Sequence, residues 1–233
     1  MRANEPTFRS MCQRIIVIVL AGLVCFATTS VAVADIIPGL YNTGVDDFGV
    51  PLAPGAVDPH YTLTISADPG YPFPGPAYVV DPLPGDWLPN TASSQWINPS
   101  GEPITHFTGV YEYALEFDLT GLDPSSAFIS GTWALDDGLG GALILINGAP
   151  VPASGHAYPG WLALESFSIS SGFVPGINTL TFSTTNEPSV WFKPTCLHVS
   201  SLVGVAAPIP QPAAIWTGMM LLGYLVFRRN RKH

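Results

Sequence analysis

Basic side chains are scarce in the middle of this sequence. Residues 35–207 hold 16 acidic residues and a single basic one, Lys193, which gives a net charge of −15. Such a segment repels nucleic-acid phosphates and anionic lipid head groups, so nucleic acid is excluded as a partner. It attracts cations, and Ca²⁺ is the plausible divalent ion outside a cell because its ligands are carboxylate and carbonyl oxygens. The alternative is that the charge only keeps the protein soluble in a crowded surface matrix.

Cysteine is equally scarce. The chain has three cysteines, and two of them, Cys12 and Cys25, lie in the first 34 residues. Cys196 is therefore alone in the remainder, which excludes an intrachain disulfide there and a zinc site built from cysteines. We expect Cys196 to be a small core residue and not a nucleophile.

Local catalytic motifs are also missing. No Ser-x-x-Lys, Gly-x-Ser-x-Gly or His-Glu-x-x-His string occurs. Glu112 and Glu116 stand four positions apart on one expected strand, about 13 Å at about 3.3 Å per residue. A glycosidase pair needs roughly 5–10 Å. The sequence therefore predicts a protein that is not an enzyme. A Ser–His–Asp triad assembled in space is left open, and with it a polysaccharide hydrolase as the third hypothesis.

The N-terminus has the pattern of a secretory signal peptide. Three arginines precede an apolar run over residues 15–26, and Ala32-Val33-Ala34 supplies small residues at a cleavage site. We expect export through the secretion translocon and cleavage after Ala34. Residues 35–207 are then long enough for one domain with a sizeable core.

The C-terminus, residues 208–233, has the pattern of a membrane stop. A proline-rich start leads into an apolar run at residues 213–227, which ends at the basic residues Arg228, Arg229, Arg231 and Lys232. As a helix this run is about 22 Å long, short for a bilayer core of about 30 Å. Its basic end is predicted to stay in the cytoplasm.

This tail resembles the PEP-CTERM class of bacterial sorting signals, and the motif of Ile209, Pro210, Gln211, Pro212 and Ala213 is similar to its VPLPA variant. Gln211 departs from the Glu or Leu of the common forms. The resemblance implies cleavage by an exosortase-type membrane peptidase, after a transient precursor in the inner membrane of a Gram-negative bacterium. The passenger would then reach the cell surface or the extracellular matrix.

Residues 35–207 read as short strands separated by turns. Tyr111, Tyr113, Leu115, Phe117 and Leu119 alternate with polar residues, which predicts one buried and one solvated face. Residues 142–146 read as a strand buried on both faces, and Asn147-Gly148 as a hairpin turn. Residues 68–90 are proline-rich and read as a long surface loop in which only residues 77–80 could pair. The expected fold is an all-β antiparallel sandwich or jelly roll. Strands are expected at residues 60–66, 110–119, 127–135, 142–146, 164–169, 177–185 and 197–205.

Two segments resemble the galactose-binding-like jelly rolls. Residues 133–138 and 143–148 are similar to a hairpin of that family whose strands end in Asp-Asp and Asn-Gly. Residues 173–182 resemble its Pro-Gly-x-Asn-x-Leu strand entry. The resemblance implies a jelly-roll fold.

Candidate ligand-binding residues lie in the expected loops. Asp136 and Asp137, expected at a loop rim beside Asn147, could ligate Ca²⁺ or accept hydrogen bonds from sugar hydroxyls. The alternative for them is turn chemistry. Trp87 and Trp161 could stack on sugars, or could cap the ends of the core.

The first functional hypothesis is a structural or adhesive component of the extracellular polysaccharide matrix. The alternative is a carbohydrate-binding module that uses these side chains, with or without Ca²⁺, and polysaccharide as its partner.

Overall fold

The computed structural model describes residues 33–83, 87–137, 141–152, 160–188 and 194–209. Strands make up the regular structure of these residues, apart from one 3₁₀ turn, η1 (Pro124–Ser126). The predicted all-β class is therefore confirmed. The strands are β1 (Asp35–Ile36), β2 (Val57–Ile65), β3 (Gly75–Val79), β4 (Ile97–Asn98), β5 (Gly109–Asp118), β6 (Phe128–Asp136), β7 (Leu143–Ile146), β8 (Ala149–Pro150), β9 (Glu165–Ile169), β10 (Ile177–Asn186) and β11 (Cys196–Ala206).

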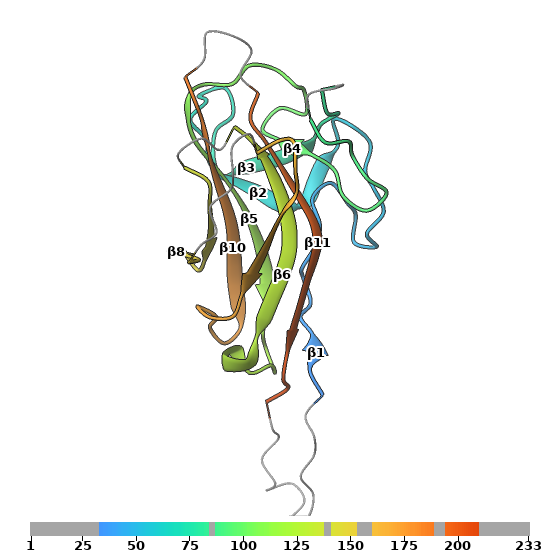
Figure 1. The fold of residues 1–233 in the computed structure, drawn as a ribbon, viewed down its shortest axis with the longest axis vertical. Helices are drawn as coiled ribbons and strands as arrows, with labels where there is room; N and C mark the ends of the chain where they lie inside the picture. The colour runs from blue at the N-terminus through green and yellow to red at the C-terminus, as the bar shows by residue number, and fades with distance from the viewer. Residues whose placement is uncertain (1–32, 84–86, 138–140, 153–159, 189–193, 210–233) are drawn as a thin grey trace, which may run out of the picture. The chain divides into compact units, whose positions relative to one another are not determined.

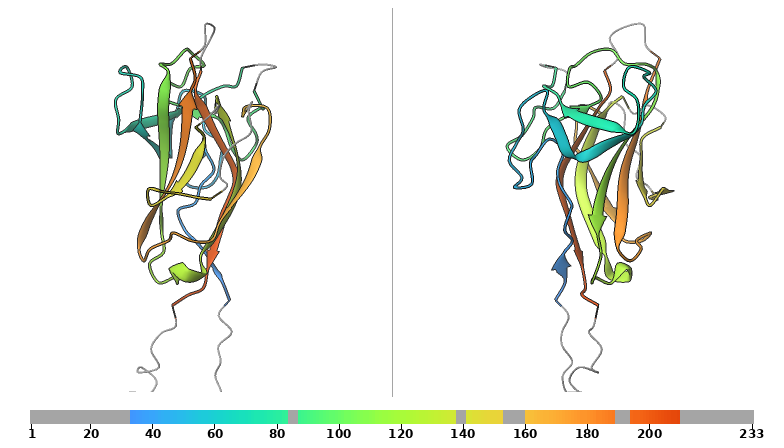
Figure 2. Two further views of the ribbon diagram at one scale, coloured as in Figure 1. Left: turned by 60° about the vertical axis from the view of Figure 1, so that its left-hand side comes forward. Right: turned by 180° about the vertical axis from the view of Figure 1, so that it is seen from behind.

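The strands form one hydrogen-bonded path in the order β8-β7-β10-β5-β2-β3-β4-β11-β6-β9, and β1 pairs with β11. Every pair of neighbours is antiparallel, as predicted. The two-residue strand β4 links β3 to β11, so the two layers of the expected sandwich belong to a single curled sheet. The proline-rich segment at residues 68–90, predicted to be a surface loop, contains strand β3. Pro76 in this strand is exposed. Figures 1 and 2 show β2 and β3 turning away from the direction of the long strands.

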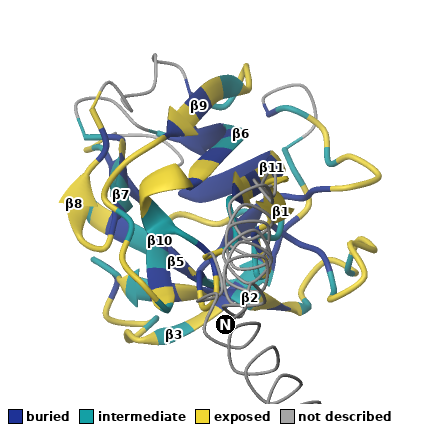
Figure 3. Cartoon of the chain, turned by 90° about the horizontal axis from the view of Figure 1, so that it is seen from below, coloured by how far each residue is buried: buried dark blue, intermediate teal, exposed yellow. Residues whose placement is uncertain are grey.

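The core lies between β5 and β10 on one side and β6, β9 and β11 on the other. The ring of Phe182 on β10 lies 5.6 Å from Trp133 on β6 and 5.7 Å from Phe167 on β9, measured between centroids. Strands far apart along the path therefore face each other through aromatic side chains. Figure 3 shows buried positions concentrated along these strands and exposed ones along β8 and the loops.

β5 shows the predicted alternation. Its five apolar residues, Tyr111, Tyr113, Leu115, Phe117 and Leu119 just beyond its end, are at most 2% exposed. Glu116 on the opposite face is exposed, and Glu112 and Asp118 are half-buried. The prediction for β7 is wrong, because Leu143 is exposed and Leu145 half-buried, which leaves one buried face.

The Asn147-Gly148 turn joins β7 to β8 as predicted. Both residues have positive φ, 51° and 78°, as a type I′ hairpin turn requires. At the other end of the described unit, β1 pairs with the last residues of β11, so its entry and exit lie side by side (Figure 1).

Most of the predicted leader and sorting tail lies outside the described residues, including residues 213–227 and the terminal basic cluster. Among the described residues, no helix has the length and apolar character needed to cross a membrane.

Candidate functional site

A depression of about 560 Å³ opens on the outer, polar face of β2, β5 and β10. The structure places aromatic, hydroxyl and carboxylate side chains around it. Its lining includes Tyr41, His60, Thr62, Thr64, Ala114, Glu116 and Thr179.

The floor of the depression follows from strand register. Glu116 lies opposite Thr179 of β10, and Ala114, two residues back on β5, lies opposite Thr62 of β2. Alternate residues of a strand point to the same face, so these side chains share the outer surface. The methyl group of Ala114 leaves a low point between taller threonine and glutamate side chains.

The wall of the depression comes from the segment between β1 and β2. Gly39 adopts φ +85°, and a Cβ there would lie 3.1 Å from the Cα of Phe117 and 3.2 Å from the Glu116 carbonyl oxygen. Glycine therefore lets the chain pass directly over β5. Two residues later the Tyr41 ring stacks on His60, with centroids 3.6 Å apart and an interplanar angle of 2°.

Buried polar groups hold the stacked pair in place. The Tyr61 hydroxyl donates to the Tyr41 carbonyl oxygen at 2.8 Å. Asp58 accepts from the backbone N–H groups of Gly44 (2.6 Å), His60 (2.8 Å) and Tyr61 (3.1 Å). Burial raises the pKa of Asp58, although these three donors pull it down. These hydrogen bonds fix the backbone on both sides of the stacked pair.

Acidic groups dominate the electrostatics of this face. Glu116 lines the depression, and the Asp47 carboxylate lies 3.7 Å from the His60 Nε2 atom. The described residues contain no lysine or arginine, because all eight fall in the ranges left out. Among the described residues the charges around the depression are thus negative, and histidine is the nearest of their side chains that can carry positive charge.

The predicted cluster of Asp136, Asp137 and Asn147 is not assembled. Asp137 accepts from the backbone N–H of Glu187, just beyond the end of β10. Asn147 accepts from Thr179 N–H near the start of β10. These contacts are eight residues apart on one strand, about 26 Å. The expectation of a shared rim is wrong because β7 runs away from the end of β6, and its hairpin lies at the far end of β10.

Each member of that cluster has structural partners. Asn147 donates to the Gly172 carbonyl oxygen and to Asn178 Oδ1, both at 2.9 Å. Asp136 is 4% exposed and accepts from the Trp87 indole at 2.8 Å. Asp136 and Asp137 are joined by a cis peptide bond. Within the described ranges no group of three or more His, Cys, Asp or Glu side chains is placed to hold a metal ion. The Ca²⁺ prediction therefore gains no further ligands there.

The predicted aromatic platforms differ in exposure. Trp87 is 7% exposed and packs in a second core cluster with Trp96, Ala134 and Cys196. That placement does not fit stacking on a sugar and matches the core-capping alternative. Trp161 packs against the same cluster and is half-buried. Cys196 is fully buried, and burial raises the pKa of its thiol, as expected of a core residue.

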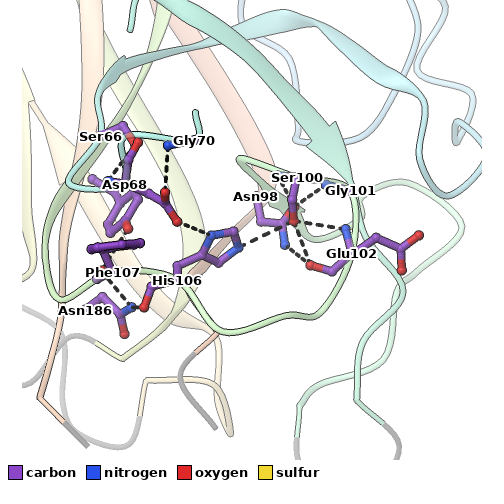
Figure 4. Close-up of polar contacts among 11 residues, drawn as sticks. Ser66, Asp68, Gly70, Asn98, Ser100, Gly101, Glu102, His106, Phe107 and Asn186 are labelled. Atoms are coloured by element: carbon purple, nitrogen blue, oxygen red, sulfur yellow. Dashed lines mark hydrogen bonds and ion pairs between the residues drawn. The ribbon is translucent and has the colours of Figure 1, made fainter. Parts of the chain in front are cut away.

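The structure also brings together a serine, a histidine and an aspartate (Figure 4). His106 Nδ1 lies 3.5 Å from Asp68 Oδ2, and its Nε2 lies 3.4 Å from Ser100 Oγ. The Ser100 hydroxyl already donates to the Glu102 carbonyl oxygen at 2.9 Å, and the His106 side chain has no exposed surface. The imidazole is thus closed off from solvent, and its contacts join the loops that carry Asp68 and Ser100.

The residues of the depression were missed by sequence reasoning. Thr62 and Thr64 alternate with buried residues in a predicted strand, and Glu116 lies on the predicted solvated face of another, so the sequence contains part of the signal. Tyr41 and Gly39 carry no local pattern, because their role depends on contacts with β5 and with His60.

No protein-family model matches the chain, and a comparison with curated proteins finds no match. Among solved structures it is similar to the family 35 carbohydrate-binding module of Paenibacillus barcinonensis, at 16% identity over 61% of this chain and 94% of that one, with TM-score 0.32. A family 35 module from an environmental isolate matches at 10% identity over 57% and 90%, with TM-score 0.31. A β-glucosidase from Kluyveromyces marxianus in complex with glucose matches at 11% identity over 69% and 19%, with TM-score 0.24.

Proposed function

We propose that residues 35–207 form a carbohydrate-binding domain and that the depression on β2, β5 and β10 is its binding site. The observation that carries the proposal is the combination of a stacked aromatic pair with hydroxyl and carboxylate groups around one hollow. We also propose that the curled sheet belongs to the galactose-binding-like jelly rolls, as the segments at residues 133–148 and 173–182 suggest.

The chemistry of the lining suits a sugar. A pyranose ring has apolar C–H faces and an equator of hydroxyl groups, so it needs an aromatic surface beside hydrogen-bonding side chains. Tyr41, half-buried with one face on His60, supplies the aromatic surface. Glu116 accepts from hydroxyls, whereas Thr62 and Thr179 can both donate and accept.

A binding measurement on the full 233-residue chain tests this function. We expect binding to at least one neutral oligosaccharide on a glycan array, and an affinity about fivefold weaker after Tyr41→Ala, since an aromatic contact contributes about 1 kcal/mol. Tyr78→Ala, on β3 and outside the depression, is the matched control. Each variant is first checked for an unchanged unfolding midpoint.

Absence of binding to every glycan would contradict the proposal. A purely structural or adhesive role in the polysaccharide matrix would then be the better account, supported by the −15 charge of residues 35–207. Equal losses for Tyr41→Ala and Tyr78→Ala would keep carbohydrate binding but move the site elsewhere. Hydrolysis of a polysaccharide by the wild-type chain would favour the enzyme hypothesis instead.

We further propose delivery to the cell surface by an exosortase-type system, based on the motif at residues 209–213 and the terminal basic cluster. Replacing Arg228, Arg229, Arg231 and Lys232 with glutamine should leave the tail unprocessed or misoriented, because the charges that hold the cytoplasmic end are gone. Immunoblotting of the precursor and surface labelling of intact cells measure this. Normal surface delivery of the variant would refute the sorting proposal.

A further inference from the structure

From the charges around the depression we infer that its ligand is a polysaccharide with free amino groups, such as a de-N-acetylated amino sugar. This inference rests on the proposed carbohydrate site and adds the class of sugar. It concerns Glu116, whose side chain lines the depression.

Glu116 lies between groups that can orient a sugar. On one side, Glu116 pairs with Thr179 of β10. On the other side, Tyr61 of β2 pairs with Leu115, so the next residue pair of this antiparallel register is His60 with Glu116. The stacked Tyr41 ring lies above His60. A sugar resting on the Tyr41 side of the hollow therefore has a carboxylate within its reach. An ammonium group paired with that carboxylate forms a charge-assisted hydrogen bond.

The acidic side chains around Glu116 repel a negatively charged sugar. Glu112 and Asp118 lie on the same face of β5 as Glu116, on either side of the floor, and Asp47 stands beside His60. No lysine or arginine occurs among the described residues to receive a carboxylate or a sulfate. Uronic acids and sulfated sugars would meet this repulsion with no lysine or arginine among the described residues to offset it. A cationic chain, in contrast, is drawn to this surface at long range, and salt weakens that attraction.

Affinity measurements with three hexasaccharides test the inference on the full-length chain at mildly acidic pH, where glucosamine is protonated. The probes are a glucosamine hexamer, an N-acetylglucosamine hexamer and a galacturonic acid hexamer. We expect the order glucosamine, then N-acetylglucosamine, with galacturonic acid weakest, and a glucosamine affinity that falls as salt rises. Glu116→Gln should weaken glucosamine binding about fivefold and leave N-acetylglucosamine binding within about twofold.

Glu102→Gln is the matched control, because it removes the same charge from an exposed side chain outside the depression. A glucosamine preference that is lost in Glu116→Gln and kept in Glu102→Gln supports the inference. A preference that survives Glu116→Gln overturns it, as does galacturonic acid binding as tight as glucosamine. Equal binding of neutral and amino sugars overturns the inference alone. No binding to any hexamer or to a glycan array overturns the carbohydrate site as well.

Discussion

His106 Nδ1 lies 3.5 Å from Asp68 Oδ2 in the interior of a loop cluster, and this contact joins the chain after β2 to the chain before β5. Asp68 also accepts from Gly70 N–H at 2.9 Å. On the far side, Asn186 at the end of β10 donates to the His106 carbonyl oxygen at 3.2 Å. The Ser–His–Asp set therefore ties together segments that are distant in sequence.

Removing Asp68 should destabilise the protein more than removing the Ser100 hydroxyl. Asp68→Ala removes the acceptor of the Gly70 N–H and the carboxylate beside the buried His106 ring, a loss of about 1–3 kcal/mol in the free energy of unfolding. Ser100→Ala should cost about 1 kcal/mol, because Ser100 is half-buried and water can replace its hydroxyl. Urea unfolding followed by circular dichroism measures both. Ester hydrolysis by the wild type that disappears in Ser100→Ala would instead assign the set to catalysis.

His198 should make stability depend on pH. Its Nε2 lies 2.8 Å from Ser94 Oγ, and burial lowers its pKa to about 4. The ordinary histidine pKa is about 6.5, so between these values the unfolded chain binds more protons. The unfolding free energy is therefore highest above about pH 6.5 and falls as the pH drops toward about 4, by a total on the order of 3 kcal/mol.

Unfolding midpoints in urea across that range test this, with His198→Gln expected to flatten the slope. Ser94→Ala should lower stability at every pH and keep the slope, since it leaves the buried imidazole in place. Asp58 acts in the opposite sense, because its raised pKa favours the folded state as the pH falls. An unchanged slope in His198→Gln would show that other groups cause the pH dependence.

Gly39→Ala should both destabilise the fold and weaken glycan binding. The new Cβ would meet the backbone of β5 at 3.1 Å and would also force alanine into positive φ. We expect a loss of about 2–3 kcal/mol together with a shift of the Tyr41 wall. Gly49→Ala is a matched control, since Gly49 has φ +75° and no heavy atom within 4 Å of a built Cβ.

Gly49→Ala should lose only about 1 kcal/mol of stability, from the strain of alanine at positive φ, and should keep its glycan affinity. Thermal unfolding and the binding assay together separate the strain of alanine at positive φ from the effect of the close contact with β5. Equal losses of stability in the two variants would mean that the passage over β5 is not tight, and the account of the wall would then be wrong.

Local periodicity predicted most of the long strands of this fold and the buried and solvated faces of β5, but not the two exposed positions of β7 or the sites. The alternation of β5 identified both its buried tyrosines and the exposed Glu116, because side-chain direction along a strand is a local property. The wall of the depression depends on Gly39 crossing β5, a contact between residues distant in sequence. Asp136 and Asn147 looked adjacent because they are close in sequence, yet β7 separates them by its whole length.

Trp87 and Trp96 allow the role of the second core cluster to be tested by a matched pair of substitutions. Their rings lie 5.2 Å apart. The Trp87 indole donates to the Asp136 carboxylate at 2.8 Å, whereas that of Trp96 donates to the Leu88 carbonyl oxygen at 2.7 Å. Hydrogen bonds to a charged group contribute more to stability than those between neutral groups.

Trp87→Phe should therefore cost about 2–3 kcal/mol and Trp96→Phe about 1–2 kcal/mol, each including some lost packing, with glycan affinity unchanged in both. Circular dichroism in urea measures the unfolding, because the substitutions remove the fluorescent rings themselves. If Trp87→Phe retained full stability but lost glycan binding, Trp87 would be a sugar platform after all, and the ligand would bind near Asp136 and not at Tyr41.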